Sequence, residues 1–574
     1  MARTVGIGIQ QFDKVIDGNY FYIDKTSFIK EWWESGDDVT LITRPRRFGK
    51  TLNMSMVEQF FSVDYADRGE LFEGLAIWQE EKYQKLQGTY PVISLSFANI
   101  KEPDYEITEY RIRQLLMKQY EKTSFLLKSE VLSKAEKVYF ERMCSDMGRA
   151  DAPMALYQLS DYLQRYYGKK VIILLDEYDT PMQEAYINGY WNELVTFTRS
   201  LFNATFKTNP FLARGIMTGI TRVSKESIFS DLNNLKVVTT TSNEYATTFG
   251  FTEEEVFAGL EECGLSAQKE KVKRWYDGFI FGNYSDIYNP WSVLNFLDTG
   301  KYSTYWANTS ANSLVDKLIR EGSKRVKTTF EELIKGKTIQ CPIDEQIVFN
   351  QLDHSESAIW SLLLASGYLK VLSKEKEDEI TDSVRPKYEL TITNYEVRRM
   401  FLCMVQDWFN ETGGDYNDFV QALLRGNLKE MNAYMNRVTL QTFSYFDTGK
   451  NPSGREPERF YHGFVLGLIA ELGRDYVITS NRESGFGRYD VMLEPKETKN
   501  DAIILEFKVH EPEEESTLQE TVAAALAQIE EKQYEAALIA KGIPKERIRR
   551  YGFAFEGKKV LIGVSLGKYM KEIS

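Results

Sequence analysis

A glycine, a lysine and a threonine stand next to one another early in the chain, where an apolar stretch gives way to a helical pattern. Gly49 lets the backbone approach a phosphate, Lys50 can reach the terminal phosphates of a nucleotide, and the hydroxyl of Thr51 is suited to binding Mg²⁺. A helix that begins here adds the partial positive charge of its N-terminus. We therefore predict a site for ATP and Mg²⁺ in this loop, with Arg47 and Phe48 also contacting the nucleotide.

The loop departs from the common phosphate-binding pattern at one position. Arg44 stands where that pattern has its first glycine. Glycine normally eases the turn because it tolerates backbone conformations that other residues avoid. A Gly-Lys-Thr tripeptide alone is weak evidence, so a basic surface loop is the alternative interpretation.

Two carboxylates follow the apolar strand predicted over 171–175. Asp176 is placed to hold Mg²⁺, directly or through water, and Glu177 to orient or activate the attacking water. A charged pair after five apolar residues is also what an ordinary strand end looks like, but the order of the two motifs favours nucleotide binding. Thr218, near the end of the next apolar strand, is a candidate sensor of the γ-phosphate. For Thr218, an ordinary strand end followed by a basic turn is an equally good interpretation.

A second constellation lies near the C-terminus. Asp490 precedes an apolar stretch, and Glu506 and Lys508 lie on the apolar strand predicted over 502–509. Residues two apart on a strand share a face, so Glu506 and Lys508 point together. Two carboxylates suit Mg²⁺ or Mn²⁺, and a lysine can stabilise negative charge at a phosphate. We predict a metal-dependent nuclease site. The alternative is a domain that kept the nuclease fold but lost the catalytic activity.

Further polar residues are candidates for that site. Glu458 and His462 are four residues apart on a predicted helix, so they share a face and either can add a metal ligand. A packed helix histidine is the equal alternative for His462. Gln528 resembles the glutamine of a Gln-x-x-x-Tyr motif, but the tyrosine is displaced to Tyr534 and Lys532 occupies the expected place.

Apolar stretches alternate with helical patterns in the first 245 residues. Because parallel strands buried on both faces read as continuous apolar runs, this alternation indicates an α/β domain with a mainly parallel sheet. The strands are predicted over 39–44, 91–97, 171–175 and 213–220.

Helical stretches dominate the middle of the chain, over 246–446. Thr252 and Glu255 have the spacing of a capping box that opens a helix. The helices predicted over 357–366 and 396–410 and the strands predicted over 368–373 and 387–393 suit a winged-helix element.

A linker over 447–457, rich in glycine, proline and polar residues, opens the last region, 447–574. The pattern that follows predicts a compact α/β domain. Its elements are a helix at 458–472, strands at 475–481, 487–493 and 502–509, a helix at 517–538 and a strand at 550–556.

The composition limits the function. With 574 residues, of which 43% are hydrophobic, the chain is expected to form several folded domains. A net charge of −13 excludes uniform coating of nucleic acid, so contact with DNA or RNA must use a local groove. Four cysteines without CxxC spacing and three histidines argue against a zinc or His-rich centre and favour a reducing compartment. No signal peptide or membrane-spanning stretch is recognisable, so we expect a soluble, cytoplasmic protein without a membrane partner.

Several segments together resemble a bacterial family that joins an AAA-ATPase-like domain to a C-terminal domain of the PD-(D/E)XK nuclease superfamily. In that family the Arg44 form of the loop is usual. The resemblance implies ATP binding by a P-loop domain at 1–245 and a nuclease-like domain at 447–574. The matching segments are Tyr22–Thr26, Arg44–Thr51, Leu175–Asp179, Lys225–Phe229, Trp275–Gly278 and Asn289–Ser292.

Three functional hypotheses follow. The first is an ATPase coupled to a metal-dependent nuclease that acts on DNA or RNA. The second is a nucleotide-switched signalling or scaffold ATPase whose C-terminal domain binds nucleic acid without cleaving it, and the third is a nucleotide-binding protein without cleavage activity. The choice between DNA and RNA and the formation of a homo-oligomer stay open.

Overall fold

The computed structural model describes residues 3–207, 209–222, 229, 232–306, 313–344, 352, 355–375, 386–410, 416–442, 465–466, 468–469, 472, 475–484, 487–497, 500–512, 515–556 and 559–564. Internal contacts divide the chain into two units. The first comprises Met1–Leu318 and Thr338–Arg398, and the second comprises Ile319–Lys337 and Arg399–Ser574. The predicted domain boundaries, at 245/246 and 446/447, stay predictions.

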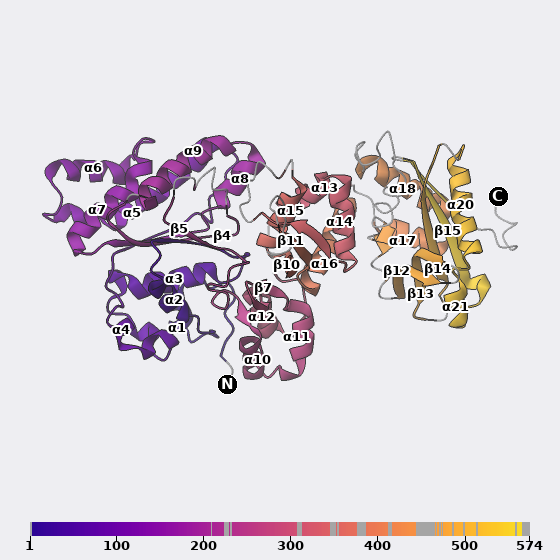
Figure 1. The fold of residues 1–574 in the computed structure, drawn as a ribbon, viewed down its shortest axis with the longest axis horizontal. Helices are drawn as coiled ribbons and strands as arrows, with labels where there is room; N and C mark the ends of the chain where they lie inside the picture. The colour runs from indigo at the N-terminus through magenta and orange to yellow at the C-terminus, as the bar shows by residue number, and fades with distance from the viewer. Residues whose placement is uncertain are drawn as a thin grey trace. The chain divides into compact units, whose positions relative to one another are not determined.

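A five-stranded parallel sheet forms the core of the first unit (Figure 1). Two of its strands, β1 and β3, are buried along their whole length, as apolar runs with helices on both faces must be. Because β4 lies between β1 and β3, the carboxyl ends of the three strands meet at one edge, where ligands bind in sheets of this kind. The order is β2 (Val92–Ser96), β3 (Val171–Asp176), β4 (Leu212–Gly219), β1 (Val39–Thr43) and β5 (Leu235–Val238).

Helices cover both faces of this sheet (Figure 1). One face carries α1 (Phe12–Asp17), α2 (Ser27–Ser35), α3 (Lys50–Phe61) and α4 (Glu81–Gln84). The other carries α5 (Tyr105–Lys122), α6 (Lys134–Ser145), α7 (Ala155–Tyr167), α8 (Thr180–Asn188) and α9 (Trp191–Phe202). Aromatic side chains fill the core of the first face, where Phe12 stacks on Phe72 and Trp32 packs edge-on against Phe61.

Residues 251–306 add a small antiparallel sheet and three helices to the first unit. Thr252 and Glu255 form the predicted capping box: the Thr252 hydroxyl accepts from the Glu255 N–H, and the Glu255 carboxylate accepts from the Thr252 N–H. The strands are β6 (Phe251–Thr252), β7 (Phe279–Phe281) and β8 (Tyr284–Tyr288), and the helices are α10 (Glu253–Glu262), α11 (Lys269–Tyr276) and α12 (Pro290–Thr299).

The rest of the middle region combines helices with a second three-stranded antiparallel sheet, the mixture that a winged-helix element requires. Both predicted strands are present, as β10 (Leu369–Lys374) and β11 (Lys387–Ile392), and β9 (Ile339–Pro342) joins them. The helices are α13 (Ser313–Glu321), α14 (Lys324–Ile334), α15 (Glu356–Ala365) and α16 (Tyr395–Asn410).

A mixed five-stranded sheet forms the core of the second unit, and its strands follow chain order. Only β14 and β15 run parallel to each other. Apolar side chains of α17 and α18 share a core with one face, and those of α20 and α21 with the other. The strands are β12 (Tyr476–Ser484), β13 (Gly487–Pro495), β14 (Ala502–Val509), β15 (Ile548–Glu556) and β16 (Lys559–Val564). The helices are α17 (Tyr416–Arg425), α18 (Leu428–Thr442), α20 (Leu518–Glu531) and α21 (Ala536–Ala540). The predicted α/β class, with a parallel N-terminal sheet, a largely helical middle and a C-terminal α/β domain, is confirmed.

Some elements differ from the prediction. The helix predicted over 517–538 is interrupted between α20 and α21, because Gln533 adopts a left-handed backbone conformation (φ 51°) that an α-helix cannot contain. Strands β5 and β16 were not predicted. Asn432 and Asn436 of α18 hydrogen bond to the backbone of β16, the edge strand, at distances from 2.6 to 3.0 Å. The helix predicted over 458–472 lies mostly outside the described residues.

Candidate active sites

The predicted phosphate loop connects β1 to α3 and turns through two left-handed residues. Gly49 has φ 81° and no atom within 4 Å of the position where a Cβ would stand, so backbone conformation, not crowding, explains the glycine. Arg47 has φ 64°, which is uncommon for a residue with a side chain. The loop therefore presents its backbone at the N-terminus of α3, the geometry that favours an anion.

Lys50 is buried within its own loop. Its Nζ donates to the carbonyl oxygens of Arg44 and Pro45, both at 3.1 Å, and lies 3.3 Å from the Glu177 carboxylate. The loop thus wraps round the lysine ammonium, and the lysine and glutamate predicted from distant segments meet directly.

Asp176, at the end of β3, is bonded to the first turn of α3 and to β4 through its carboxylate. Thr51 donates its hydroxyl to Oδ2 of Asp176 over 2.8 Å, and Thr218 donates its hydroxyl to Oδ1. Thr218 Oγ1 also accepts from the N–H of Glu177 at 3.3 Å. Burial, and then the neighbouring charge of Glu177, raise the pKa of Asp176. The structure therefore brings together the residues predicted to hold Mg²⁺, orient water and sense the γ-phosphate.

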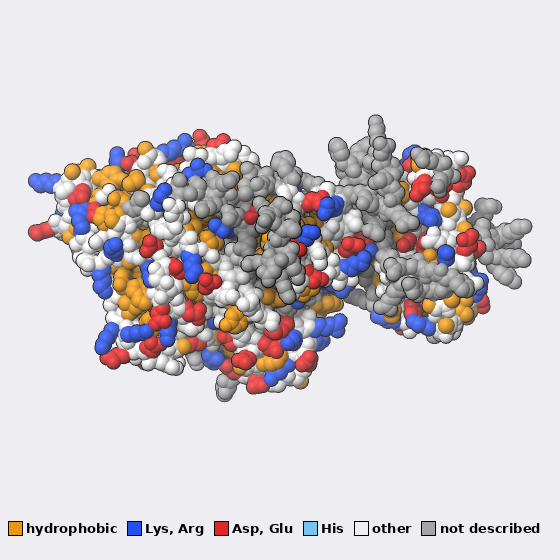
Figure 2. All heavy atoms as spheres, viewed as in Figure 1, with side chains coloured by type: hydrophobic (Ala, Val, Ile, Leu, Met, Phe, Trp, Pro, Cys, Tyr) orange, Lys and Arg blue, Asp and Glu red, His pale blue; other side chains and the backbone are white. Residues whose placement is uncertain are grey.

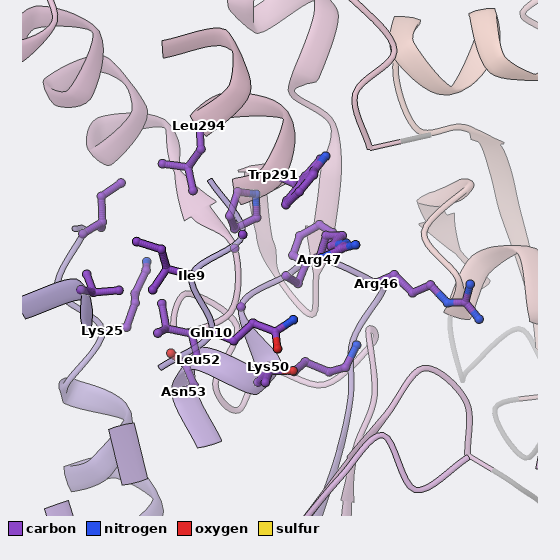
Figure 3. A pocket seen from close by; sticks show the side chains of 18 of the residues that line it. Ile9, Gln10, Lys25, Arg46, Arg47, Lys50, Leu52, Asn53, Trp291 and Leu294 are labelled. Carbon is purple, nitrogen blue, oxygen red and sulfur yellow. The ribbon is translucent and has the colours of Figure 1, made fainter. Parts of the chain in front are cut away.

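Lys50, Thr51 and Glu177 line a cavity of about 340 Å³ in the first unit, whereas Asp176 and Thr218, which bond to Thr51 and Glu177, are not part of its lining. In Figure 3 the cationic Arg46, Arg47 and Lys50 lie on one side of the view, and the apolar Ile9, Leu52 and Leu294 lie on the other. The Arg47 guanidinium lies 4.4 Å from the ring centre of Trp291, at the start of α12. The cavity thus has a mainly cationic part and a mainly apolar part, which also includes the Lys25 side chain paired with Glu255.

Arg44 and Phe48 anchor the loop. The Arg44 guanidinium is fully buried, donates to the carbonyl oxygen of Thr239 at 2.6 Å and lies over the ring of Phe281, and burial lowers its pKa to about 9. Its backbone is not left-handed, which explains why no glycine is needed there. The Phe48 ring packs on Phe279 and Phe281, so the predicted contact of Phe48 with nucleotide would be made by its backbone.

Residues far along the chain hold the phosphate loop in place, and they were not predicted from the sequence. The Arg46 carbonyl oxygen accepts from the Trp306 indole N–H at 2.9 Å and from the Asn289 amide at 3.3 Å. Lys101, which follows β2, also lines the cavity. More than 200 residues separate Arg46 from Asn289, so no local pattern could pair them.

In the second unit, Asp490 and Glu506 face each other across β13 and β14. The pairing of Val491 with Leu505, continued by one residue, sets them opposite, and opposite residues share a face of an antiparallel pair. Oδ2 of Asp490 accepts from the N–H of Phe507 at 2.9 Å, and the buried carboxylate of Glu506 accepts from the N–H of Asp490 at 3.4 Å. Lys508, two residues after Glu506, shares this face.

Gln528 and Tyr534 complete this face despite their irregular spacing. Gln528 Nε2 donates to the Glu506 carboxylate and to the Tyr534 hydroxyl, 3.1 Å away. The left-handed turn at Gln533 ends α20 and returns Tyr534 to Gln528, which the Gln-x-x-x-Tyr rule does not anticipate. Burial, with a contribution from the charge of Glu506, raises the pKa of Tyr534 to about 12.

His510 was also missed. It directly follows β14, two residues beyond Lys508, and its Nδ1 is 3.0 Å from Thr521 Oγ1 and 3.5 Å from the Glu515 carboxylate. Glu458 and His462, the predicted additional metal ligands, lie outside the described residues. Within the described residues no group of three or more His, Cys, Asp and Glu side chains is arranged to hold a metal ion.

Comparisons with known proteins agree with the resemblance seen in the motifs. Residues 6–229 match the family model described as a predicted AAA-ATPase, and residues 456–564 match that of the PD-(D/E)XK nuclease superfamily. An Azotobacter chroococcum mcd 1 protein titled "Uncharacterized protein in vnfD 5'region" is 24% identical over 398 residues, which cover 69% of this chain and 68% of that protein. None of the helices in the described part of the chain combines the length and apolar character that a membrane crossing needs.

Proposed function

We propose, from the premise that an AAA-ATPase-like domain and a PD-(D/E)XK nuclease-superfamily domain share this chain, that the protein hydrolyses ATP and cleaves DNA or RNA with a divalent metal ion. The observation that carries the ATPase part is the connection of Thr51, Asp176 and Thr218 by hydrogen bonds beside the Lys50–Glu177 ion pair. It supports one site in which metal, phosphate and attacking water meet.

The residues of the first site have separate roles in this proposal. Lys50 binds the terminal phosphates, and the loop amides around Gly49 bind phosphate oxygens. Thr51 and Asp176 offer oxygen donors alone, which fits Mg²⁺, and the ion supplies neutralisation of phosphate charge when bound. Glu177 accepts a hydrogen bond from the attacking water and orients it, and Thr218 contacts the γ-phosphate.

The shape of the cavity supports a nucleotide rather than a smaller phosphate. Ile9, Leu52 and Leu294 provide apolar surface beyond the charged part, where a base can pack. Gln10, in the same lining, is the polar side chain best placed to hydrogen bond with the edge of that base. We take ATP as the nucleotide.

The nuclease part rests on the shared face of Asp490, Glu506 and Lys508. Two facing carboxylates give an oxygen donor set that fits Mg²⁺ or Mn²⁺, and the metal supplies Lewis-acid stabilisation of the phosphate when bound. Glu458 or His462 is proposed as a further ligand. Lys508 stabilises the charge that develops on the phosphate.

The surface charge suits limited contact with nucleic acid. On the face drawn in Figure 2, basic and acidic side chains of the described residues are interspersed, without a continuous basic band. We therefore expect weak, salt-sensitive binding at a local groove. None of the four cysteines forms a disulfide, which suits the cytoplasm as the proposed location.

One observation favours a second candidate function. The Glu506 carboxylate accepts from the Gln528 amide and from a backbone N–H, and these donors compete with a metal ion for its oxygens. A chain in which this arrangement persists would bind nucleic acid without cutting it, and ATP would act as a switch.

A cleavage assay distinguishes the two functions. Wild type and Lys508→Ala would be incubated with single- and double-stranded DNA and RNA, with Mg²⁺ or Mn²⁺, with and without ATP, while phosphate release is measured in parallel. We expect metal-dependent cleavage by wild type that EDTA stops, and loss of cleavage in Lys508→Ala. ATP turnover without cleavage under any condition would support the switch instead.

A further inference from the structure

Asp179, three residues after Asp176, lies at the edge of the sheet but has no exposed surface. Its Oδ2 accepts from the backbone N–H of Ile220 at 3.0 Å, and from both the N–H and the hydroxyl of Thr221 at 2.8 Å. Ile220 and Thr221 come immediately after Gly219, the last residue of β4. The Asp179 carboxylate therefore holds the chain just beyond the proposed γ-phosphate sensor.

Tyr178 holds the same segment from the other side. Its hydroxyl donates to the carbonyl oxygen of Thr221 at 2.8 Å, and its N–H donates to the carbonyl oxygen of Thr218 at 2.9 Å. The N–H of Glu177 donates to Thr218 Oγ1. Three consecutive residues after β3 are thus bonded to the end of β4.

The same carboxylate is linked to the phosphate loop. Arg46 donates from Nη2 to Oε1 of Gln183 at 3.1 Å, and Gln183 donates from Nε2 to Oδ2 of Asp179 at 3.3 Å. Gln183 lies in α8, one turn beyond Asp179. Asp179 therefore connects the loop after β1, the turn after β3 and the end of β4.

The arrangement carries structural costs that packing alone does not explain. Glu177 has φ 53°, a left-handed conformation that is unfavourable for a residue with a side chain. Oδ1 of Asp179 is buried and has no hydrogen-bond partner among the described residues. A Cβ at Gly219 would stand 2.7 Å from that Oδ1, so this approach requires glycine. Unfavourable features of this kind concentrate where a structure must hold functional groups.

We infer that Asp179 is a positioning residue for ATP hydrolysis, which fixes Thr218 against Glu177 so that the phosphate sensor and the water-orienting carboxylate keep their separation. Asp179 does not line the cavity and touches no substrate in this role. The inference rests on the proposed ATPase function. A displacement on the order of 1 Å at the reacting groups can reduce a rate about a hundredfold.

The test compares Asp179→Ala and Asp179→Asn with wild type in the full-length protein. ATP affinity would be measured by equilibrium binding, and kcat and KM by phosphate release. We expect kcat of Asp179→Ala to fall about tenfold to a hundredfold, with ATP affinity within about threefold of wild type. Asp179→Asn keeps one oxygen that accepts from the two backbone N–H groups, so it should recover part of that loss.

Glu109→Gln is the matched control. Glu109 is also a fully buried carboxylate of the first unit, but its partners Arg113 and Arg149 lie away from the cavity lining. Loss of this charge should lower thermal stability and leave kcat per folded molecule unchanged. If Asp179→Ala does not fold, Asp179→Asn and Tyr178→Phe decide, and both should lower kcat without a matching change in ATP affinity.

The outcomes separate the inference from the function on which it rests. Wild-type turnover in every folded Asp179 and Tyr178 variant would overturn the positioning role and leave the ATPase proposal standing. Equal loss of ATP affinity and kcat would also overturn it, because that pattern reports a damaged binding site. A wild-type chain that binds ATP without hydrolysing it would overturn both.

Discussion

The two sites of this chain arrange their charges in different ways. At the nucleotide cavity positive and negative groups lie side by side, because Lys50 is 3.3 Å from Glu177. Each carboxylate oxygen of Asp176 accepts a hydrogen bond from a threonine hydroxyl. At the second site Asp490 and Glu506 face each other, and the hydrogen bonds described for them come from neutral backbone and amide groups. One site is internally compensated, and the other carries adjacent negative charges.

Because of this contrast, the two sites depend on a bound cation to different degrees. A compensated site is organised by its own charges, so a substitution that keeps the shape of the side chain should alter chemistry more than folding. Two facing carboxylates repel each other until a cation or a proton lies between them. Removal of divalent metal should therefore affect the second site more than the first.

Glu177→Gln should have the largest effect on turnover. The amide keeps the shape of the side chain but cannot accept a proton, so ATP turnover should fall about 10²- to 10⁴-fold, while ATP binding is kept. Parallel measurement of phosphate release and ATP affinity checks this. Glu193→Gln, an exposed residue on α9, is the control. Normal turnover in Glu177→Gln would show that the Lys50–Glu177 pair is structural.

Lys508→Ala tests the site of the facing carboxylates. An ammonium is not a metal ligand, so Mn²⁺ affinity should be retained while cleavage falls about 10²- to 10³-fold, the effect of removing one group that stabilises developing charge. Calorimetry with Mn²⁺ and a cleavage assay measure the two quantities. Lys559→Ala, on the edge strand β16, should behave as wild type. Loss of metal affinity together with cleavage would mean that Lys508 organises the carboxylates instead.

Gln528→Ala should have a smaller effect. The Gln528 amide orients the Glu506 carboxylate and bonds to Tyr534, so its loss should weaken metal binding or cleavage about tenfold to a hundredfold. The control is Gln519→Ala at the exposed start of α20. A Gln528→Ala protein that gains metal affinity would indicate that the amide competes with metal, which favours the binding-only function.

The sequence predicted what local patterns encode. Continuous apolar runs identified β1 and β3, and alternation placed Glu506 and Lys508 on one face, because both signals arise from neighbouring residues. The anchoring of Arg46 by Asn289 and Trp306 depends on contacts between distant segments. No spacing rule encodes such contacts.

The turn at Gln533 shows a different limit of sequence reasoning. Helical periodicity continues through 517–538, yet the backbone leaves the helix there and Tyr534 returns to Gln528. A tertiary hydrogen bond competes with local helix propensity at this point. Asp179 was overlooked for a related reason: three of its four donors lie more than 40 residues away, and only the fold brings them together.

The first unit has a pair of neighbouring carboxylates of its own, Asp277 and Asp286, and this pair provides the smallest test of the comparison. Asp277 follows α11 and lies close enough to Asp286 for the two charges to interact, and Asp286 lies 3.3 Å from the Lys273 ammonium. Burial, and then the charge of Asp286, raise the pKa of Asp277 from 3.8 to about 7, and nearby Lys370 has its own pKa lowered by burial. Here a proton, not a metal, relieves the repulsion.

The sign of the pH effect follows from this shift. Between about pH 4 and pH 7 the folded protein holds a proton on Asp277 that the unfolded chain has released, so the free energy of unfolding should fall as pH rises through this range. Asp277→Asn, which is neutral at every pH, should remove that slope, and Asp298→Asn on the exposed end of α12 should keep it. Pulse proteolysis in urea, with fragments of the first unit identified, measures the free energy. Mg²⁺ should leave the Asp277 slope unchanged, because of these two carboxylate pairs only Asp490 and Glu506 are proposed to take a cation. An Asp277 slope that Mg²⁺ abolishes would contradict the distinction between a proton-relieved and a metal-relieved carboxylate pair.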